Sequence, residues 1–267
     1  MSIQPTQPQS IGGVLDTSFQ LYKATFVKMI PLSLLMVVAS SLQYIYMFSQ
    51  GGNPADPFAM MNMMQSWSYW LTVLAGMIAT TWILSAAYLK IGAIGRGDDL
   101  GVGAALQASL TRLPAMVVML LLFILALTLG MLLLLIPGII LMVSLALCFN
   151  TGLFENKGPI AALSESHRLV WGNWWRTLVI LSVGVIVIMV IYLIAGLIIG
   201  IIAPLLVAGG AEDVLLFTMV SSMLVGLLMS LLLTPFYISL AIAIYWDLKL
   251  RKDGGDLAAR VGALNPA

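Results

Sequence analysis

Long runs of apolar residues dominate the chain, and the polar positions collect in the short segments between them. A helix needs about 20 apolar residues to cross the roughly 30 Å hydrocarbon core of a bilayer, where unpaired backbone groups are costly. Six runs have or approach this length: residues 29–48, 67–89, 114–135, 137–154, 177–207 and 214–246. The pattern therefore predicts an all-α, polytopic membrane protein with six transmembrane helices.

The third and fourth runs are separated only by Ile136, Pro137 and Gly138. A proline followed by a glycine favours a turn over one continuous helix. We therefore expect these two runs to form a tight helical hairpin.

Basic residues give the orientation of the helices. The predicted loops 49–66 and 208–213 carry only Asp56, Glu212 and Asp213, so every Lys and Arg lies on the other side. The positive-inside rule then places both termini in the cytoplasm, and the change from apolar to charged sequence at Asp247 marks the exit of the last helix. The basic residues are Lys23, Lys28, Lys90, Arg96, Arg112, Lys157, Arg168, Arg176, Lys249, Arg251, Lys252 and Arg260.

Three amphipathic segments, 13–26, 101–114 and 158–175, precede predicted spans on the cytoplasmic side. Each contains a leucine followed three residues later by a serine, and in the third Glu165 and Arg168 are spaced for an ion pair. Amphipathic helices of this kind lie in the headgroup plane. They serve either as elbows that turn the chain back into the bilayer or as a cytoplasmic platform.

A platform of this kind would recognise lipid headgroups or dock a partner. Its candidate residues are cationic, and each would contribute about 1 kcal/mol against an anionic membrane surface. They are Arg112, Lys157, Arg168 and Arg176.

Small residues at four-residue spacing occur in the last two runs, which lets helix backbones approach closely. They predict that these helices pack against each other or across a homo-oligomer interface. The residues are Gly196, Gly200, Ser222, Gly226 and Ser230.

Composition excludes several classes of function. The chain is 61% hydrophobic and 9% charged with a mean hydropathy of +1.06, far from soluble usage. A net charge of +1 offers no field for nucleic acid. The single cysteine, Cys148, and the single histidine, His167, predict no metal centre or cofactor. No acidic or basic residue lies at the middle of a span, so we expect neither an intramembrane enzyme nor ion-coupled transport.

The expected organisation has three parts: a disordered lead at 1–10, a six-helix membrane domain at 11–250 and a cytoplasmic tail at 251–267. The leading hypothesis is a non-enzymatic module that binds membrane lipids or docks an inner-membrane protein partner. The alternative is a transporter or channel for a lipid-like or neutral solute, lined by groups such as Asn150, Thr80 and Thr81.

Three stretches carry a resemblance to a known group: 13–32, 136–181 and 244–257, which includes "IYWDLKLRKDGGDL". They resemble the YciC-like bacterial inner-membrane proteins and the related membrane domain fused to glycerophosphoryl diester phosphodiesterases. The resemblance implies a six-helix bundle in the bacterial cytoplasmic membrane. The chain ends shortly after its last predicted span, so we do not expect the hydrolase domain or its activity.

Overall fold

The computed structural model describes residues 2–50, 58–208 and 214–264, and within these ranges the protein is helical without strands. The helices are α1 (Ile11–Ser40), α2 (Leu42–Ser49), α3 (Ala59–Met63), α4 (Trp67–Arg96), α5 (Val102–Leu110), α6 (Leu113–Leu133), α7 (Leu135–Ser144), α8 (Cys148–Phe154), α9 (Pro159–Val170), α10 (Trp174–Ala208) and α11 (Val214–Leu264). Asp56, Glu212 and Asp213, the acidic residues of the two predicted outer loops, lie outside the described ranges.

The prediction of an all-α chain with six apolar helices is confirmed. Within the described ranges, six segments are long and apolar enough to cross a membrane: Ile11–Ser40, Trp67–Arg96, Leu113–Leu133, Leu135–Phe154, Trp174–Ile202 and Leu224–Gly254. The fourth segment consists of α7 and α8, which a short break at residues 145–147 separates.

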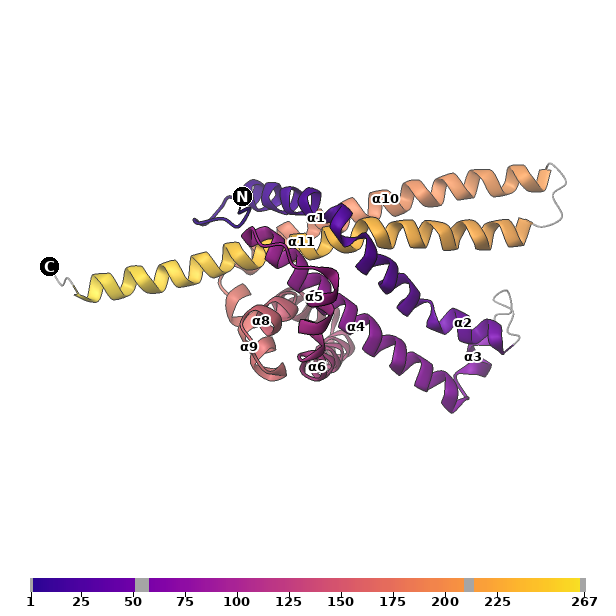
Figure 1. The fold of residues 1–267 in the computed structure, drawn as a ribbon, viewed down its shortest axis with the longest axis horizontal. Coiled ribbons are helices and arrows are strands. Elements are labelled where there is room, and N and C mark those ends of the chain that lie inside the picture. Colours follow the sequence, from indigo (N-terminus) through magenta and orange to yellow (C-terminus); the bar gives the residue numbers. More distant parts are fainter. Residues whose placement is uncertain (1, 51–57, 209–213, 265–267) are drawn as a thin grey trace.

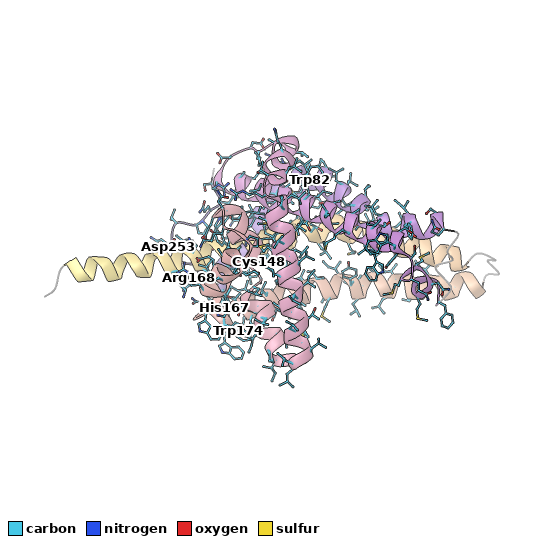
Figure 2. The ribbon with its side chains drawn as sticks, turned by 90° about the horizontal axis from the view of Figure 1, so that it is seen from below. Trp82, Cys148, His167, Arg168, Trp174 and Asp253 are labelled. Carbon is cyan, nitrogen blue, oxygen red and sulfur yellow. The ribbon has the colours of Figure 1, made fainter. Side chains whose placement is uncertain are left out.

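The helices do not share one direction. Helices α10 and α11 form one long antiparallel pair, and α1 packs against α11 and α4 (Figure 1). Helix α6 is seen end-on in Figure 1, and from the perpendicular view of Figure 2 it runs across the line of α10 and α11. We call α1, α4, α10 and α11 the long set, in which α4 and the later part of α1 run obliquely to α10 and α11 (Figure 1). A second set, around α6, lies crosswise to α10 and α11.

Helix α9 lies antiparallel beside α7 and α8. The Thr151 hydroxyl of α8 donates a hydrogen bond to the Ala162 carbonyl of α9 at 2.8 Å. The indole Nε1 of Trp174, the first residue of α10, donates to the Ile140 carbonyl of α7 at 3.4 Å. The hairpin of α6 and α7 is tight, because a Cβ at Gly130 would lie 3.2 Å from the Gly138 Cα. These contacts join the crosswise helices to the start of α10.

The three amphipathic segments do not all become separate helices. The second and third contain α5 and α9, whereas the first is the opening part of α1, which continues without a break through Pro31. No turn signal separates the amphipathic part of α1 from the apolar part, so one helix contains both. Ser18, Ser109 and Ser166, the serines of the three Leu-x-x-Ser sequences, are all fully buried.

The two ends of the chain are described for residues 2–10 and for α11 up to Leu264, while the predicted division into three parts stays a prediction. Residues 2–10 are not free, because the backbone N–H groups of Ile3 and Gln4 both donate to the Gly95 carbonyl at the end of α4. Helix α11 continues through residue 250 to Leu264, so no helix end marks the predicted start of the tail. The backbone of this uncharged segment bonds to a carbonyl at the end of α4 that has no partner within the helix. Such backbone bonds cannot be predicted from the composition of the segment.

Candidate functional site

A buried carboxylate joins three parts of the chain. Asp247 of α11 is 1% exposed, and its Oδ2 accepts hydrogen bonds from Arg176 Nη2 at 3.0 Å and from Arg251 Nε at 3.0 Å. Its Oδ1 accepts the backbone N–H of Gln9 at 2.7 Å. Both guanidinium groups also donate to the Gln9 carbonyl. We call these four residues the Asp247 clasp; it fixes the start of α10 and the N-terminal segment to α11.

A second group of charges surrounds two glutamates. Glu155 accepts hydrogen bonds from Tyr245 and Lys249 of α11 at 2.9 and 3.0 Å and pairs with Lys157 at 2.8 Å. Lys157 also lies 2.9 Å from Glu165 of α9. We call Glu155, Lys157, Glu165, Arg168 and Lys249 the glutamate cluster. It connects the loop after α8 to α9 and to α11.

The ion pair between Glu165 and Arg168 is confirmed, with N–O distances of 2.9 and 2.5 Å. The hydrogen bonds from Arg168 are the main cause that lowers the pKa of Glu165 from its ordinary 4.5 to about 2, and Lys157 adds to the shift against the effect of burial. Burial raises the pKa of Glu155, but hydrogen bonds from Lys157, Lys249 and Tyr245 outweigh it and leave this pKa below its ordinary value. Both carboxylates are therefore held in their charged form.

The lowered pKa of Glu165 gives a pH dependence with a definite sign. A carboxylate with a lower pKa in the folded state stabilises the protein above its unfolded-state pKa, and this contribution disappears as the pH falls toward the folded-state value. We expect wild type to be more thermostable than Glu165→Gln above about pH 5, and this difference to shrink between pH 4.5 and 2. Thermal unfolding in detergent across this range measures it. A difference that is already lost between about pH 7 and pH 5 would contradict the assignment.

Three of the four predicted platform cations have acidic partners within the chain. Lys157 and Arg168 belong to the glutamate cluster and Arg176 to the Asp247 clasp. Arg112 lies apart from them, half-buried at the start of α6. The structure therefore does not gather the four side chains into one free basic surface.

The residues of the predicted small-residue spacing lie on α10 and α11, and the described ones show no close mutual contact. A Cβ built at Gly196, Gly200 or Gly226 would meet no atom of the described residues within 4 Å. Ser230 is half-buried, and the side chain of Ser222 lies outside the described part of the protein. Packing between copies of the chain stays a prediction for these residues.

The polar groups considered for a transport path donate hydrogen bonds within the protein, although the buried Oδ1 of Asn150 has no partner among the described residues. Asn150 of α8 donates through Nδ2 to the Ala241 carbonyl of α11 at 2.8 Å. The hydroxyls of Thr80 and Thr81 donate to the carbonyls of Gly76 and Met77 in their own helix. Among the described residues, no three His, Cys, Asp or Glu side chains are grouped so that they could hold a metal ion.

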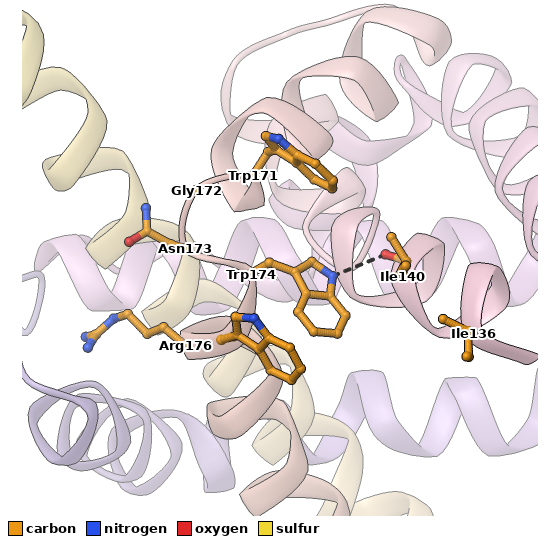
Figure 3. Close-up of a pocket in the computed structure, with 8 residues that line it drawn as sticks. Ile136, Ile140, Trp171, Gly172, Asn173, Trp174 and Arg176 are labelled. Atoms are coloured by element: carbon orange, nitrogen blue, oxygen red, sulfur yellow. Dashed lines mark hydrogen bonds between the residues drawn. The ribbon is translucent and has the colours of Figure 1, made fainter.

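An apolar pocket lies where the α6–α7 hairpin meets the start of α10 (Figure 3). It has a volume of about 660 Å³ and is lined by Ile136, Ile140, Trp171, Gly172, Asn173, Trp174, Trp175 and Arg176. Gly172 has a φ of +96°, which favours glycine and turns the chain sharply between α9 and α10. The turn places three tryptophans on one side and two isoleucines of α7 on the other. We call this the tryptophan pocket.

The tryptophan pocket exposes apolar surface without a free charge. Trp175 is 75% exposed and Trp171 56% exposed. The Nε1 of Trp174 is used in the bond to Ile140, and the Arg176 guanidinium points away from the indoles in Figure 3 toward its partners in the Asp247 clasp. The pocket therefore suits an apolar ligand better than a charged one. The predicted amphipathic segment 158–175 includes the three tryptophans, but the sequence did not indicate the α7 residues opposite them.

Comparison with known proteins supports a bacterial membrane protein. The chain is similar to the UPF0259 membrane protein plu2479 of Photorhabdus laumondii subsp. laumondii, a protein of an uncharacterised family, with 28% identity over 102 residues. The match covers 38% of this chain and 40% of that protein. No family model matches the chain, and no solved structure matches it. With its six apolar helices, the chain is a multi-pass membrane protein.

Proposed function

We propose that the protein is a non-enzymatic, lipid-interacting module of the bacterial inner membrane, and that its tryptophan pocket receives an acyl chain of a membrane lipid. The observation that carries the proposal is the apolar lining of this pocket by two exposed indoles, Trp171 and Trp175, and by Ile136 and Ile140. Tryptophan is enriched where membrane proteins meet the boundary between headgroups and acyl chains, because its ring is both large and weakly polar. A pocket of this kind matches the chain of a lipid rather than its headgroup.

The charged residues favour a structural role over catalysis or headgroup binding. Arg176, Lys157 and Arg168 already have acidic partners, so anionic lipid would compete with those bonds. The same bonds hold Glu155 and Glu165 in their charged form. Asp247 is buried among its bonding partners. We assign these side chains to holding the helix ends together around the tryptophan pocket.

The distribution of Lys and Arg supports the inner-membrane placement and the orientation. The Asp247 clasp and the glutamate cluster contain five of the basic side chains, and the positive-inside rule assigns such an end to the cytoplasm. The tryptophan pocket adjoins the clasp through Arg176. The lipid that it holds would come from the cytoplasmic leaflet.

Lipid retention tests the function. Phospholipid copurified with the Trp171→Ala, Trp175→Ala double variant is measured by native mass spectrometry, with Trp67→Ala as the control because Trp67 is 76% exposed but outside the pocket. We expect the double variant to bind lipid about tenfold more weakly, since burial of one large side chain contributes about 1.5–3 kcal/mol. Retention equal to that of wild type and Trp67→Ala would contradict the proposal. The same spectra give the subunit number and so test the homo-oligomer predicted from the glycine spacing.

A further inference from the structure

Two sets of apolar helices that lie crosswise to each other cannot both span one flat bilayer. Helix α6 is seen end-on in Figure 1 and runs across the line of α10 and α11 in Figure 2. Helix α10 has 35 residues, a length of about 50 Å at 1.5 Å per residue, and most of its described side chains beyond Val185 are exposed. Such a helix cannot lie flat without placing apolar side chains in water on one side. The long set therefore crosses the membrane, and α6 lies close to its plane.

The tip of the α6–α7 hairpin has no polar side chain for a water-facing turn. Every residue from Leu129 to Val143 is apolar, glycine or proline. Turns at an aqueous surface often carry Asn, Asp or Ser, whose side chains hydrogen-bond the turn backbone; this tip has Pro137 and Gly138 but none of these three. Here the five residues from Leu132 to Ile136 are each 67–77% exposed. Such a tip is stable in hydrocarbon and not at the opposite aqueous face.

The bond between Trp174 and Ile140 limits how deep the tip reaches. Trp174 begins α10, two residues before Arg176 of the Asp247 clasp, and its Nε1 lies 3.4 Å from the Ile140 carbonyl. Six residues separate Ile140 from Leu134 at the tip, which is about 9 Å of helix. The hydrocarbon core is about 30 Å thick. The tip therefore cannot extend from the start of α10 to the far side of the membrane.

One face of α6 is suited to contact with lipid. Val118, Leu121, Leu125, Leu129 and Leu132 follow the three- and four-residue spacing of one helix face and are 47–77% exposed. The opposite face carries buried Met116 and Met119, which pack on Gly152 of α8. A lipid-covered helix lying in the membrane plane has this division between one apolar exposed face and one protein-covered face.

We infer that α6 and α7 form a hairpin immersed in the acyl region of the cytoplasmic leaflet, so that α1, α4, α10 and α11 alone cross the membrane. This replaces six crossings with four, and because four is also even, both termini and Arg112 and Lys157 keep the side that the positive-inside rule gives them. The partner of the exposed α6 face and hairpin tip is thus the lipid of one leaflet. The inference does not depend on the tryptophan pocket holding a ligand.

Site-directed labelling tests the four-crossing arrangement. Native Cys148 is buried, so wild type serves as the unlabelled background for single added cysteines. Leu134→Cys reports the hairpin tip, Gln65→Cys the expected outer side and Asp98→Cys the expected cytoplasmic side; all three positions are exposed. A membrane-impermeant maleimide is added to intact spheroplasts and then to opened ones.

We expect Gln65→Cys to react in intact spheroplasts, Asp98→Cys to react only after opening, and Leu134→Cys to stay unreactive from outside. In proteoliposomes, a bimane on Leu134→Cys is expected to be quenched by lipids that carry a nitroxide on the acyl chain, several-fold more strongly than a bimane on Gln65→Cys. Labelling of Leu134→Cys from outside to the extent seen for Gln65→Cys would overturn the inference. So would equal quenching at both positions.

Discussion

Replacing Asp247 with asparagine is expected to destabilise the protein by about 3 kcal/mol. Removal of one partner from a buried ion pair costs about 3–5 kcal/mol, because it leaves the other charge without compensation. Here two guanidinium groups lose their carboxylate, and the lower end of the range applies because Arg176 and Arg251 are 18% and 30% exposed. We further expect faster proteolysis of the N-terminal segment, since Gln9 loses its contact with Oδ1.

The matched control for this variant is Asp253→Asn. Asp253 lies on the same helix, its side chain is 59% exposed and its pairing distance to Lys249 is 3.9 Å. A surface pair of this kind contributes about 0–1 kcal/mol. Thermal unfolding in detergent compares the two variants, and equal losses would show that the Asp247 clasp does not hold the fold together.

Ser166→Ala is expected to cost about 1–3 kcal/mol, because it leaves two buried backbone groups without a partner. The break between α7 and α8 frees the N–H of Leu147 and the carbonyl of Ser144 from regular helix pairing. The Ser166 hydroxyl satisfies both, as acceptor from Leu147 at 3.1 Å and as donor to Ser144 at 2.9 Å. Urea or thermal unfolding of the purified protein measures the loss.

Ser164→Ala provides the control in the same helix, because Ser164 is exposed while Ser166 is fully buried. We expect Ser164→Ala to change the stability by less than about 0.5 kcal/mol. If both alanine variants unfold at the same temperature or urea concentration as wild type, the hydroxyl of Ser166 does not stabilise the break between α7 and α8.

The sequence predicted the apolar helices well because every polar residue within a membrane span is unfavourable, so a span is visible as a run of apolar residues. Some long runs of apolar residues therefore appear directly as one helix, as Trp67–Arg96 and Leu113–Leu133 do. The predicted run 29–48 is instead divided between α1 and α2. Direction is not encoded in the same way. The run that forms α6 is about as apolar as that of α10, yet α6 lies crosswise (Figure 2), because helix direction depends on tertiary contacts such as those of α6 with α4, α7 and α9.

The candidate site was predicted only in part. The pair of Glu165 and Arg168 followed from their spacing on one helix, and the structure confirms it. The partners of Lys157 and Arg176 did not follow, because Glu155 and Asp247 meet them through tertiary contacts. One signal was present: Asp247 is a lone acid at the end of a long apolar run, and such a residue needs a cationic partner.

The Asp247 clasp and the tryptophan pocket have a common structural basis. Arg176 belongs to the clasp and also borders the pocket, so the clasp that fixes the start of α10 also fixes Trp174 and Trp175 opposite Ile136. A pocket wall that is already rigid loses less conformational entropy on binding a lipid chain than a flexible wall would. We therefore assign the buried charges to the support of an apolar site rather than to contact with the lipid itself.

Electron cryomicroscopy of the protein in nanodiscs of native lipid measures most directly where the crosswise helices and the tryptophan pocket lie relative to the bilayer. We expect α6 to lie along the acyl boundary of the leaflet nearest Asp247, with an elongated lipid chain against Trp171 and Trp175. A map in which the α6–α7 hairpin crosses the full thickness of the lipid, with Leu134 at the opposite surface and no chain against the indoles, would contradict this arrangement.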